Sequence, residues 1–407
     1  MTKLLQINTV VTYGSTGRIV DGIGDLAIAE NWGSYAAYGR KEANSKSELF
    51  RVGNLLDNYL HVLDTRLFGR HGLATRSGTK DLIKWIKEIN PSIIQLHNLH
   101  GYYLNLPILF DYLSSLEIPI VMSLHDSWNL TGHCPQFEHV GCEKWKTNCN
   151  KCPQLREYPS SLFIDRSSKN HKLKKRIFTS LHNLTLITSS EWSANLIRQS
   201  YLSEYPINII PNGVDTSIFY PREAKELEHK FNLDSKFIIL GVASVWDKNK
   251  GFFDFIELSK KLKEDEVLVM IGLDTKQLQG LPSNIIGIER TQNIDELAQW
   301  YSLADAFINL TYADTFPTTN LEALACGTPV LTYRTGGSTE SVDERTGFVV
   351  NQGDIDDTLK KLRTIKAKGK ETYSEYCSDK ALLKYQKDKQ FYEYIKIYKE
   401  QLNLKDQ

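Results

Sequence analysis

Two carboxylates flank the turn of this chain that is best suited to chemistry. Asp314 and Glu322 are eight residues apart within segment 306–342, AFINLTYADTFPTTNLEALACGTPVLTYRTGGSTESV. The segment predicts a strand, a polar loop, and a helix that starts at Thr318 or Thr319. Because the first turn of a helix has free backbone N–H groups, it can bind a phosphate. One carboxylate could then hydrogen-bond sugar hydroxyls while the other holds a ribose.

Polar residues also follow apolar runs in the first half of the chain. Gly14 and Gly17, in YGSTGR, would let the backbone approach a ligand closely, although two glycines also form ordinary turns. His125 and Asp126 end the run IPIVMSLHD. A single histidine is more often structural, but the position of His125 at a strand end beside an acid favours a functional role.

The segment LHNLHGYYLNL, residues 96–106, combines amide, imidazole and phenol side chains after a predicted strand. Asn98, His100 and Tyr103 are therefore candidates for contacts with a sugar acceptor. Packing beneath a loop is an equally good interpretation of the tyrosine.

Four of the six cysteines lie within nineteen residues, at Cys134, Cys142, Cys149 and Cys152. Four thiols that include a Cys-x2-Cys pair can form a tetrahedral zinc site. The spacing matches no common zinc finger, so structural zinc and four free thiols are equally good interpretations, while disulfides are disfavoured in a reducing cytosol. In either case the Cys-rich insert 130–155 is expected to shape the acceptor side rather than to perform chemistry.

These candidate residues need strands that end close together. Continuous apolar runs predict buried parallel strands in two sets. The runs are 4–10, 92–97, 118–125 and 184–190, then 237–244, 266–272, 284–289, 306–311 and 328–333. Helical patterns lie between the runs, at 79–89, 191–201, 252–263 and 294–304. Such alternation is typical of doubly wound α/β domains, which bind ligands at the carboxyl ends of their strands.

The length of 407 residues favours two domains, and the turn formers PNG at 211–213 mark the boundary. We expect residues 1–210 to form an N-terminal Rossmann-like domain. Residues 211–382 would form a C-terminal Rossmann-like domain. Aromatic residues at helical spacing within 383–407 predict a terminal helix that packs back on the first domain.

The composition restricts the partners and the compartment. The formal net charge is zero, which argues against a nucleic-acid partner. No apolar run reaches the roughly 18 residues that span a bilayer, and the start MTKLLQINTV lacks the features of a signal peptide. We therefore expect a cytoplasmic protein. The basic run 169–176 is most simply a solvated helix face, with contact to anionic lipids at the inner face of the membrane as the alternative.

The segment 306–342 resembles glycosyltransferase family 4. The family signature is two acids separated by seven residues and followed by an Ala-x-Ala-x-Gly-x-Pro-Val run, which Asp314, Glu322 and EALACGTPV match. PNGVD, KNKG, GGSTE and TGF match further segments of the family, so that the resemblance covers roughly the full length. The exopolysaccharide or colanic-acid-type subgroup resembles this chain most, because it shares the insert HD…TGxC…C…CxxCPQL.

The resemblance implies roles for residues that match the family motifs. The fold would be GT-B, in which two Rossmann-like domains face each other across a cleft, and the reaction would retain the anomeric configuration. Residues 1–210 would then be the acceptor-side domain, and residues 211–382 the nucleotide-sugar-binding domain. The implied catalytic residues are His125, Asp126 and Asp314. The implied donor-binding residues are Gly14, Gly17, Lys250, Thr318, Thr319, Glu322 and Glu340.

Three positions depart from the family pattern. Asp314 stands where Glu is usual, and Pro317 replaces a glycine and removes one backbone donor. Ser244 stands where an Arg usually contacts the donor diphosphate. The candidates to replace that cation are Lys248, Arg18 and Arg290.

The expected function is that of a glycosyltransferase of the hexosyltransferase type. It would transfer a sugar from a nucleotide-diphosphate sugar to a glycan or a lipid-linked oligosaccharide in cell-surface polysaccharide synthesis, and it would require no cofactor for catalysis. Two alternatives are a GT-B nucleotide-sugar epimerase, which needs no acceptor, and a non-catalytic nucleotide-sugar-binding protein, which would bind a donor without turnover.

Overall fold

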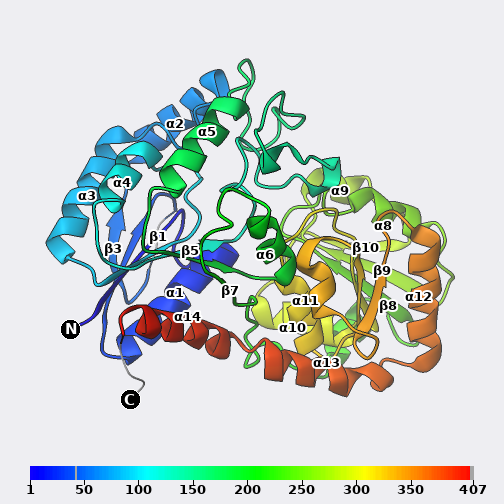
Figure 1. Cartoon of the computed structure of the whole chain (residues 1–407). Helices are drawn as coiled ribbons and strands as arrows, with labels where there is room; N and C mark the ends of the chain where they lie inside the picture. Colours follow the sequence, from blue (N-terminus) through cyan, green and yellow to red (C-terminus); the bar gives the residue numbers. More distant parts are fainter. Residues whose placement is uncertain (42–43, 404–407) are drawn as a thin grey trace. The chain divides into compact units, whose positions relative to one another are not determined.

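The computed structural model describes residues 1–41 and 44–403, which divide into two compact units (Figure 1). Unit 1 contains Met1–Ile210 together with the chain from Phe391 onward, and unit 2 contains Pro211–Gln390. Each unit is an α/β domain built on one parallel sheet.

Unit 1 has a seven-stranded sheet in the order β3-β2-β1-β4-β5-β6-β7. Its strands are β1 (Lys3–Asn8), β2 (Gly33–Tyr38), β3 (Glu48–Arg51), β4 (Ile93–Leu96), β5 (Ile120–Leu124), β6 (Leu184–Thr188) and β7 (Ile207–Ile209). Its helices are α1 (Gly14–Ala29), α2 (Leu55–Phe68), α3 (Arg76–Ile89), α4 (Leu106–Leu113), α5 (Ser167–Phe178), α6 (Glu191–Arg198) and most of α14 (Lys387–Gln401). Two short 3-10 turns, Glu138–Val140 and Lys144–Lys146, lie in the Cys-rich insert.

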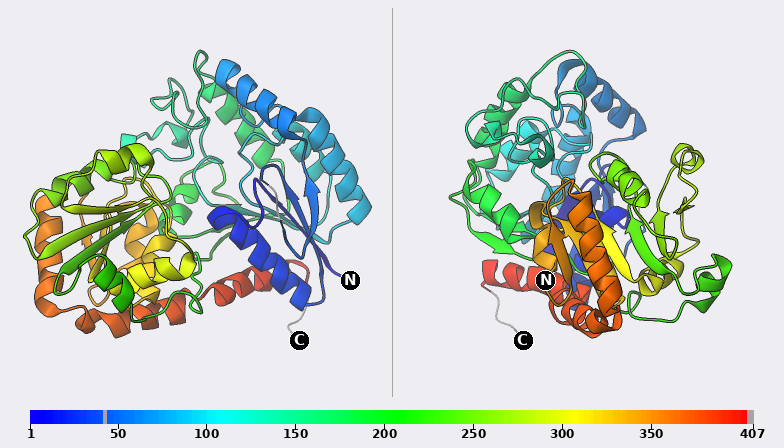
Figure 2. Two further views of the ribbon diagram at one scale, coloured as in Figure 1. Left: turned by 180° about the vertical axis from the view of Figure 1, so that it is seen from behind. Right: turned by 90° about the vertical axis from the view of Figure 1, so that its right-hand side faces the viewer.

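Helices cover both faces of this sheet (Figures 1 and 2). Because successive side chains of a strand point to opposite faces, neighbouring residues enter different cores. Ile94 and Met122 pack with α3 and α4, whereas Ile93 and Val121 pack with α1 and α14. The central strands are therefore apolar on both sides, which explains the continuous apolar runs.

Unit 2 has a six-stranded sheet in the order β10-β9-β8-β11-β12-β13. Its strands are β8 (Phe237–Val242), β9 (Glu266–Ile271), β10 (Ile285–Ile288), β11 (Ala306–Asn309), β12 (Val330–Tyr333) and β13 (Gly347–Val350). Its helices are α7 (Lys225–Lys230), α8 (Phe252–Ser259), α9 (Thr275–Gln279), α10 (Ile294–Leu303), α11 (Thr318–Ala325), α12 (Ile355–Lys368) and α13 (Glu371–Lys384), with the 3-10 turn η3 at Gly336–Ser341.

Both sheets change winding direction next to their first strand. In unit 1, β1 pairs with β2 on one side and β4 on the other, and in unit 2, β8 pairs with β9 and β11. Such a topological switch point opens a crevice at the carboxyl ends of the strands, where open α/β sheets bind ligands. The loops after β1 and β4, and after β8 and β11, are therefore the places to look for a site.

All nine strands predicted from the sequence are present, with ends that differ from the prediction by at most two residues. The strands β2, β3, β7 and β13 were not predicted. β2 is GSYAAY, whose small residues give no β signal, and β3, β7 and β13 are only three or four residues long. The helix α2 is also absent from the predicted helical patterns, and its apolar residues lie on the exposed side.

The return of the chain to unit 1 begins at Phe391 rather than at residue 383. Residues 385–387 belong to unit 2 because Val214 N donates to Tyr385 O at 2.7 Å and Lys387 N donates to Val214 O at 2.9 Å. From Phe391 onward, α14 packs on α1, and a Cβ built at Gly22 would lie 2.2 Å from the Phe391 ring. Among the described residues, no helix is both long and apolar enough to cross a bilayer.

Candidate functional site

The loops after β8 and β11 are tied together at the switch point of unit 2. Tyr312 N donates to Asn249 O at 2.7 Å, and Thr311 Oγ1 donates to the same oxygen at 3.1 Å. Gly251 has φ +73°, and a Cβ built there would lie 2.2 Å from Leu310 O. Only glycine fits this turn, because any side chain would collide with the β11 loop.

This close approach brings Lys250 to Asp314. Lys250 Nζ lies 2.8 Å from Asp314 Oδ2, with the two side chains 38% and 18% exposed. Burial lowers the pKa of Lys250, but the charge and hydrogen bond of Asp314 outweigh burial, so that the pKa is raised above its ordinary value. A permanently charged ammonium at the carboxyl edge of the sheet is suited to an anionic ligand.

The start of α11 lies at the same edge. Its N-cap position is Pro317, and no side chain caps the first turn at Thr318 and Thr319, both half-buried. Asn320 fixes this end of the helix, since its side chain bonds Asn309 Nδ2 at 2.9 Å and Ser338 Oγ at 3.1 Å. The first backbone N–H groups of α11 can therefore receive an anion without competition from a capping side chain.

Glu322 lies one turn further along α11. Its Oε2 accepts a hydrogen bond from Tyr301 OH at 2.9 Å. Tyr301 is fully buried, and burial together with the Glu322 charge raises the pKa of the phenol well above its ordinary value. The phenol therefore stays protonated and orients the Glu322 carboxylate. Tyr301 comes from α10, and no pattern in the sequence identified it.

Glu340 lies exposed on η3, the turn that follows β12. The turn is held by Ser338 Oγ, which lies 2.6 Å from Thr332 Oγ1, and by Tyr385 OH, which donates to Glu340 O at 3.4 Å. The same network that fixes α11 through Asn320 thus also fixes the loop that carries Glu340.

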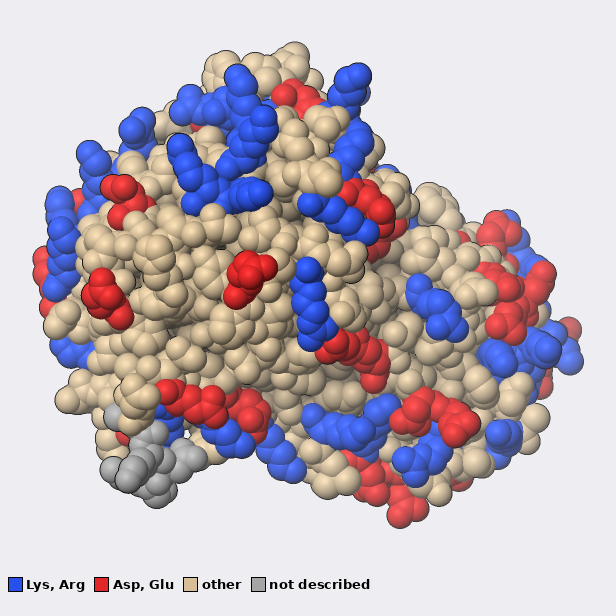
Figure 3. All heavy atoms as spheres, viewed as in Figure 1, with Lys and Arg blue, Asp and Glu red and all other residues tan. Residues whose placement is uncertain are grey.

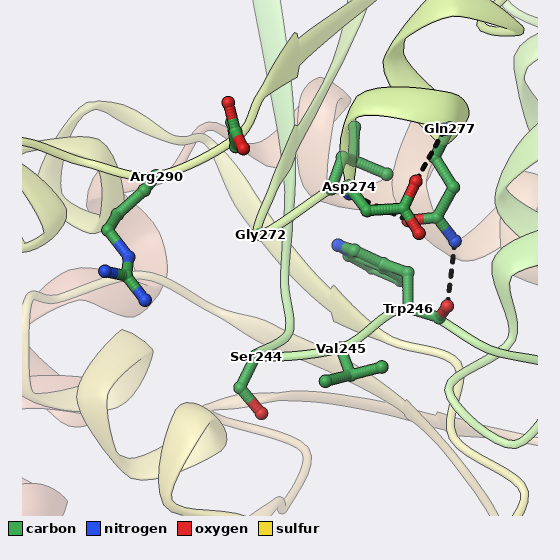
Figure 4. Close-up of a pocket in the computed structure, with 9 residues that line it drawn as sticks. Ser244, Val245, Trp246, Gly272, Asp274, Gln277 and Arg290 are labelled. Atoms are coloured by element: carbon green, nitrogen blue, oxygen red, sulfur yellow. Dashed lines mark hydrogen bonds between the residues drawn. The ribbon is translucent and has the colours of Figure 1, made fainter.

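A pocket of about 410 Å³ opens at the carboxyl ends of β8, β9 and β10. Trp246 forms one wall, held by its Nε1 bond to Ile271 O at 2.9 Å and by Gln277 Nε2, which donates to Trp246 O at 2.8 Å (Figure 4). Arg290 lines the opposite side, and Ser244 lies on the same pocket. Of the three cations that could replace the missing arginine, Arg290 is thus the one that shares a pocket with Ser244.

In unit 1, a chain of hydrogen bonds crosses the ends of β1, β4 and β5. Gln6 Nε2 donates to Val20 O at 2.7 Å, so that Gln6 Oε1 accepts from His97 Nε2 at 3.1 Å. His97 Nδ1 then accepts from His125 Nε2 at 3.1 Å, and the two rings stack with 5.4 Å between centroids. These hydrogen bonds place the proton of neutral His125 on Nε2 and its lone pair on Nδ1.

Burial keeps these imidazoles neutral. It lowers the pKa of His125 from 6.5 to about 4, against the opposing effect of Asp126. Burial, and then the charge of His125, also lowers the pKa of His97 well below its ordinary value. At neutral pH, His125 is therefore suited to accepting a hydrogen bond and is a weak proton acceptor.

Asp126 holds a second histidine. Its Oδ2 lies 2.7 Å from His100 Nε2, and its Oδ1 accepts from Trp128 N at 2.9 Å. Burial would raise the pKa of Asp126, but His100 and the hydrogen bonds bring it below the ordinary value. Tyr158 OH lies 3.0 Å from His100 Nδ1. Since both carboxylate oxygens are engaged, Asp126 orients His100.

The remaining predicted residues of unit 1 have separate environments. Tyr103 is fully buried, and its hydroxyl donates to Asn98 O at 2.9 Å, so it packs beneath the loop and does not face an acceptor. Asn98 is half-buried at the end of β4. Gly14 has φ +69° with open space at its Cβ position, whereas Gly17 is buried against Thr12. The structure therefore leaves Gly14 and Asn98 accessible at the switch point and places Tyr103 in a supporting role.

The four thiols of the insert line one small pocket. Cys134 and Cys152 lie close enough to influence each other's pKa, and Gly132 N donates to Cys149 Sγ at 3.3 Å. Within residues 1–41 and 44–403, no group of three or more His, Cys, Asp or Glu side chains is already gathered as metal ligands. Zinc at this cluster therefore stays a prediction.

Two family models match most of the chain. Residues 43–218 match the model described as glycosyltransferase family 4, and residues 236–367 match the model described as glycosyl transferases group 1. The first model falls in unit 1 and extends just past its end, and the second lies within unit 2.

Similar proteins carry related descriptions. The putative colanic acid biosynthesis glycosyl transferase WcaC of Escherichia coli is 27% identical over 225 residues, which cover 52% of this chain and 55% of that protein. The chain thus spans about half the length of this curated relative.

Solved structures show the same fold. Sucrose-phosphate synthase from Thermosynechococcus elongatus aligns with a TM-score of 0.73 at 15% identity, covering 98% of this chain and 99% of that one. Anabaena HepE, solved in complex with UDP-glucose, aligns with a TM-score of 0.67 at 13% identity, covering 98% of this chain and 100% of that one. With its two Rossmann-like sheets the chain has the GT-B fold, and with the matched models it belongs to glycosyltransferase family 4.

Proposed function

We propose that this chain transfers a sugar from a nucleoside-diphosphate sugar to a glycan or lipid-linked acceptor, with retention of the anomeric configuration. The observation that carries the proposal is the switch point of unit 2. There the charged Lys250, its partner Asp314, the uncapped start of α11 and the oriented Glu322 meet at the ends of neighbouring strands. The cation and the uncapped helix end are suited to a diphosphate, and the two carboxylates are suited to hydroxyls of a ribose and a sugar.

The difficult step of such a transfer is departure of the diphosphate, which gains negative charge as the glycosidic bond to the donor breaks. Lys250 and the N–H groups at Thr318 and Thr319 would stabilise that charge. Arg290 would add a second cation from the pocket that it shares with Ser244. UDP-sugars are the first donors to test, because the HepE structure with this fold holds UDP-glucose.

The residues of unit 1 support a mechanism without a protein nucleophile. His125 is neutral, with its lone pair on Nδ1, so it would orient a sugar by a hydrogen bond. Asp126 has both oxygens engaged and holds His100. The acceptor proton would then leave with the departing diphosphate, on the same face as the new bond.

A donor screen tests this function. Purified protein would be incubated with UDP-, GDP- and ADP-sugars, and nucleotide release and thermal stability would be measured. We expect one donor to raise the melting temperature and to release nucleotide slowly, and Lys250→Met to reduce that release by about a hundredfold or more. Glu322→Gln should weaken donor binding. The control is Lys260→Met, at the exposed end of the helix that follows Lys250, which should change neither nucleotide release nor donor binding.

Other outcomes would favour the alternatives. Conversion of a donor into an isomeric sugar nucleotide without any acceptor would indicate an epimerase. Tight binding of a donor with no turnover, even when glycan and lipid-linked acceptors are supplied, would indicate a non-catalytic binding protein. No thermal shift with any donor would contradict the placement of the site.

We propose separately that the insert thiols hold a structural zinc ion that takes no part in catalysis. Four thiols around one pocket are a suitable donor set, and the N–H of Gly132 already faces Cys149 Sγ. Lys174 is buried near these thiols, and burial lowers its pKa while the charges of Cys149 and Cys134 oppose that shift. Thiolates bound to zinc would therefore favour the charged form of this lysine. The thiols would have to move together around the ion.

Elemental analysis of the purified protein tests the zinc proposal. We expect about one zinc per chain, lost in Cys149→Ser. Cys377→Ser is the matched control, because this buried cysteine lies outside the insert. Four insert thiols that titrate freely in folded protein supplied with zinc would overturn the proposal.

A further inference from the structure

The helix α2 has its polar side inward and its apolar side outward. The residues that it buries are His61 and Thr65, both with no exposed surface. His61 is held on both nitrogens, by Thr75 Oγ1 at 2.9 Å and by Gly72 N at 3.0 Å. The exposed side carries large apolar residues at helical spacing, 52–72% exposed: Leu55, Leu56, Tyr59, Leu60 and Leu63.

This orientation is fixed by the ends of the helix. Asn54 accepts from Asp57 N at 3.0 Å, and Asp57 Oδ2 accepts from Asn54 N at 2.9 Å, which forms a capping box. Gly69 ends the helix with φ +64°. Because both ends are capped and the inner face is hydrogen-bonded, α2 cannot bury its leucines by turning over.

A second apolar segment lies beside the end of α2. Leu162, Phe163 and Ile164 are 48%, 74% and 45% exposed. Leu162 N donates to Arg66 O at 2.8 Å, and Ile164 O lies 3.0 Å from the Cβ position of Gly69. The exposed side of α2 and residues 162–164 thus form one surface, which we call the apolar face.

Cations border the apolar face. The helix α5 follows directly on residues 162–164, and Asn170 Nδ2 ties it to α2 by donating to Gly69 O at 2.8 Å. Its sequence SSKNHKLKKRIF contains no acid. Four of its cations are exposed: Lys169, Lys172, Lys175 and Arg176. Figure 3 shows lysines and arginines gathered over this part of unit 1.

We propose that the apolar face and the α5 cations form a docking surface for an anionic lipid bilayer. The apolar face gathers eight large apolar side chains that are each 45–74% exposed. Such a group is unusual on a monomer in water and marks an interaction surface. Apolar residues bordered by lysine and arginine match the boundary between acyl chains and anionic headgroups. Among the described residues no helix spans a membrane, so binding would be peripheral. The inference does not depend on the proposed transfer activity.

Vesicle flotation tests the docking surface in the absence of any sugar. The full chain would be mixed with vesicles of phosphatidylcholine alone or of phosphatidylcholine with phosphatidylglycerol. We expect binding to the anionic vesicles only. The triple substitution Lys172→Gln/Lys175→Gln/Arg176→Gln should weaken that binding by roughly a hundredfold, since each cation near the surface contributes about one kcal/mol. High salt should have a similar effect.

The apolar contribution is tested by Leu56→Ser/Leu60→Ser/Phe163→Ser. We expect a loss of about tenfold or more at constant charge. The matched control is Leu382→Ser/Leu383→Ser, which removes apolar residues 49% and 68% exposed from α13 in unit 2 and should leave vesicle binding unchanged. Circular dichroism and thermal melts verify that each variant is folded.

Two results would overturn the proposal. One is equal binding of wild type and both triple variants to anionic vesicles. The other is no binding of folded wild type to anionic vesicles. If light scattering then shows a dimer that the serine variant separates, the apolar face is assigned to a second copy of the chain.

Discussion

At the scale of single residues, Lys250 and Asp314 form an ion pair, although the sequence suggests a different ligand group for each of them. Family resemblance assigns the lysine to a diphosphate and the aspartate to a sugar. In the structure Asp314 Oδ2 lies 2.8 Å from Lys250 Nζ and raises the pKa of the lysine. Asp314 Oδ1 also accepts from Phe316 N at 3.3 Å, so the shorter side chain is held in place. We infer that a bound donor would contact both Lys250 and Asp314, which already form an ion pair before it binds.

His125 gives a prediction about pH at the same scale. Its pKa is lowered to about 4, so the neutral form persists from neutral pH down to that value. We expect kcat/KM to show no step near 6.5 that depends on His125, and His125→Asn to lower kcat without introducing one. The pH profiles of wild type and variant measure this. A step near 6.5 that the variant removes would contradict the neutral assignment.

The same shift affects stability in a defined direction. An unfolded histidine binds a proton near pH 6.5, whereas folded His125 does so only near 4. The neutral form therefore stabilises the fold above pH 6.5, and this contribution declines as the pH falls toward 4.

At the scale of elements, the loops after β8 and β11 act as one unit because Gly251 permits their contact. A side chain at this position would collide with Leu310 O, which lies 2.2 Å from the Cβ position. The hydrogen bond from Tyr312 N to Asn249 O would be strained at the same time. The placement of Lys250 therefore depends on a backbone contact and not on its own side chain.

Gly251→Ala should therefore destabilise unit 2 by about 1–3 kcal/mol and weaken donor binding, because positive φ and a collision combine. Gly141→Ala is the matched control: its φ is +58°, but its Cβ position is open, so only the smaller cost of the backbone conformation applies. Urea unfolding and donor titration measure both effects. Equal losses in the two variants would show that the contact with Leu310 O does not matter.

At the scale of the whole molecule, the chain returns to its first domain through α14. Phe391, Ile395 and Tyr398 pack into the core that contains α1, and Tyr398 OH donates to Gln95 Oε1 at 2.9 Å. The terminal helix is therefore part of the core of unit 1, although it follows unit 2 in sequence.

Phe391→Ala should destabilise unit 1 by about 3 kcal/mol, because it opens a cavity against Gly22. Tyr392→Ala, on the exposed side of the same helix at 36% exposure, should cost less than about 1 kcal/mol. Hydrogen exchange would locate the loss in the strands of unit 1. Exchange that rises in β8–β13 instead would contradict this assignment.

The sequence by itself determined the architecture and the sheet edge at which we propose the donor site. Buried parallel strands must be apolar on both faces, so that nine of them are visible as continuous runs. Motif residues such as Asp314 and Glu322 follow these runs directly, which places them at the carboxyl edge. Short or small-residue strands such as β2 leave no such pattern.

The tertiary structure alone decided which residues meet. The hydrogen bond that orients Glu322 joins α10 to α11, and the pocket that Arg290 shares with Ser244 joins the ends of β10 and β8. The burial of Tyr103 and the outward leucines of α2 likewise depend on what packs against each side chain. Sequence patterns report local periodicity and burial, whereas these contacts join residues far apart in the chain, and only packing brings them together.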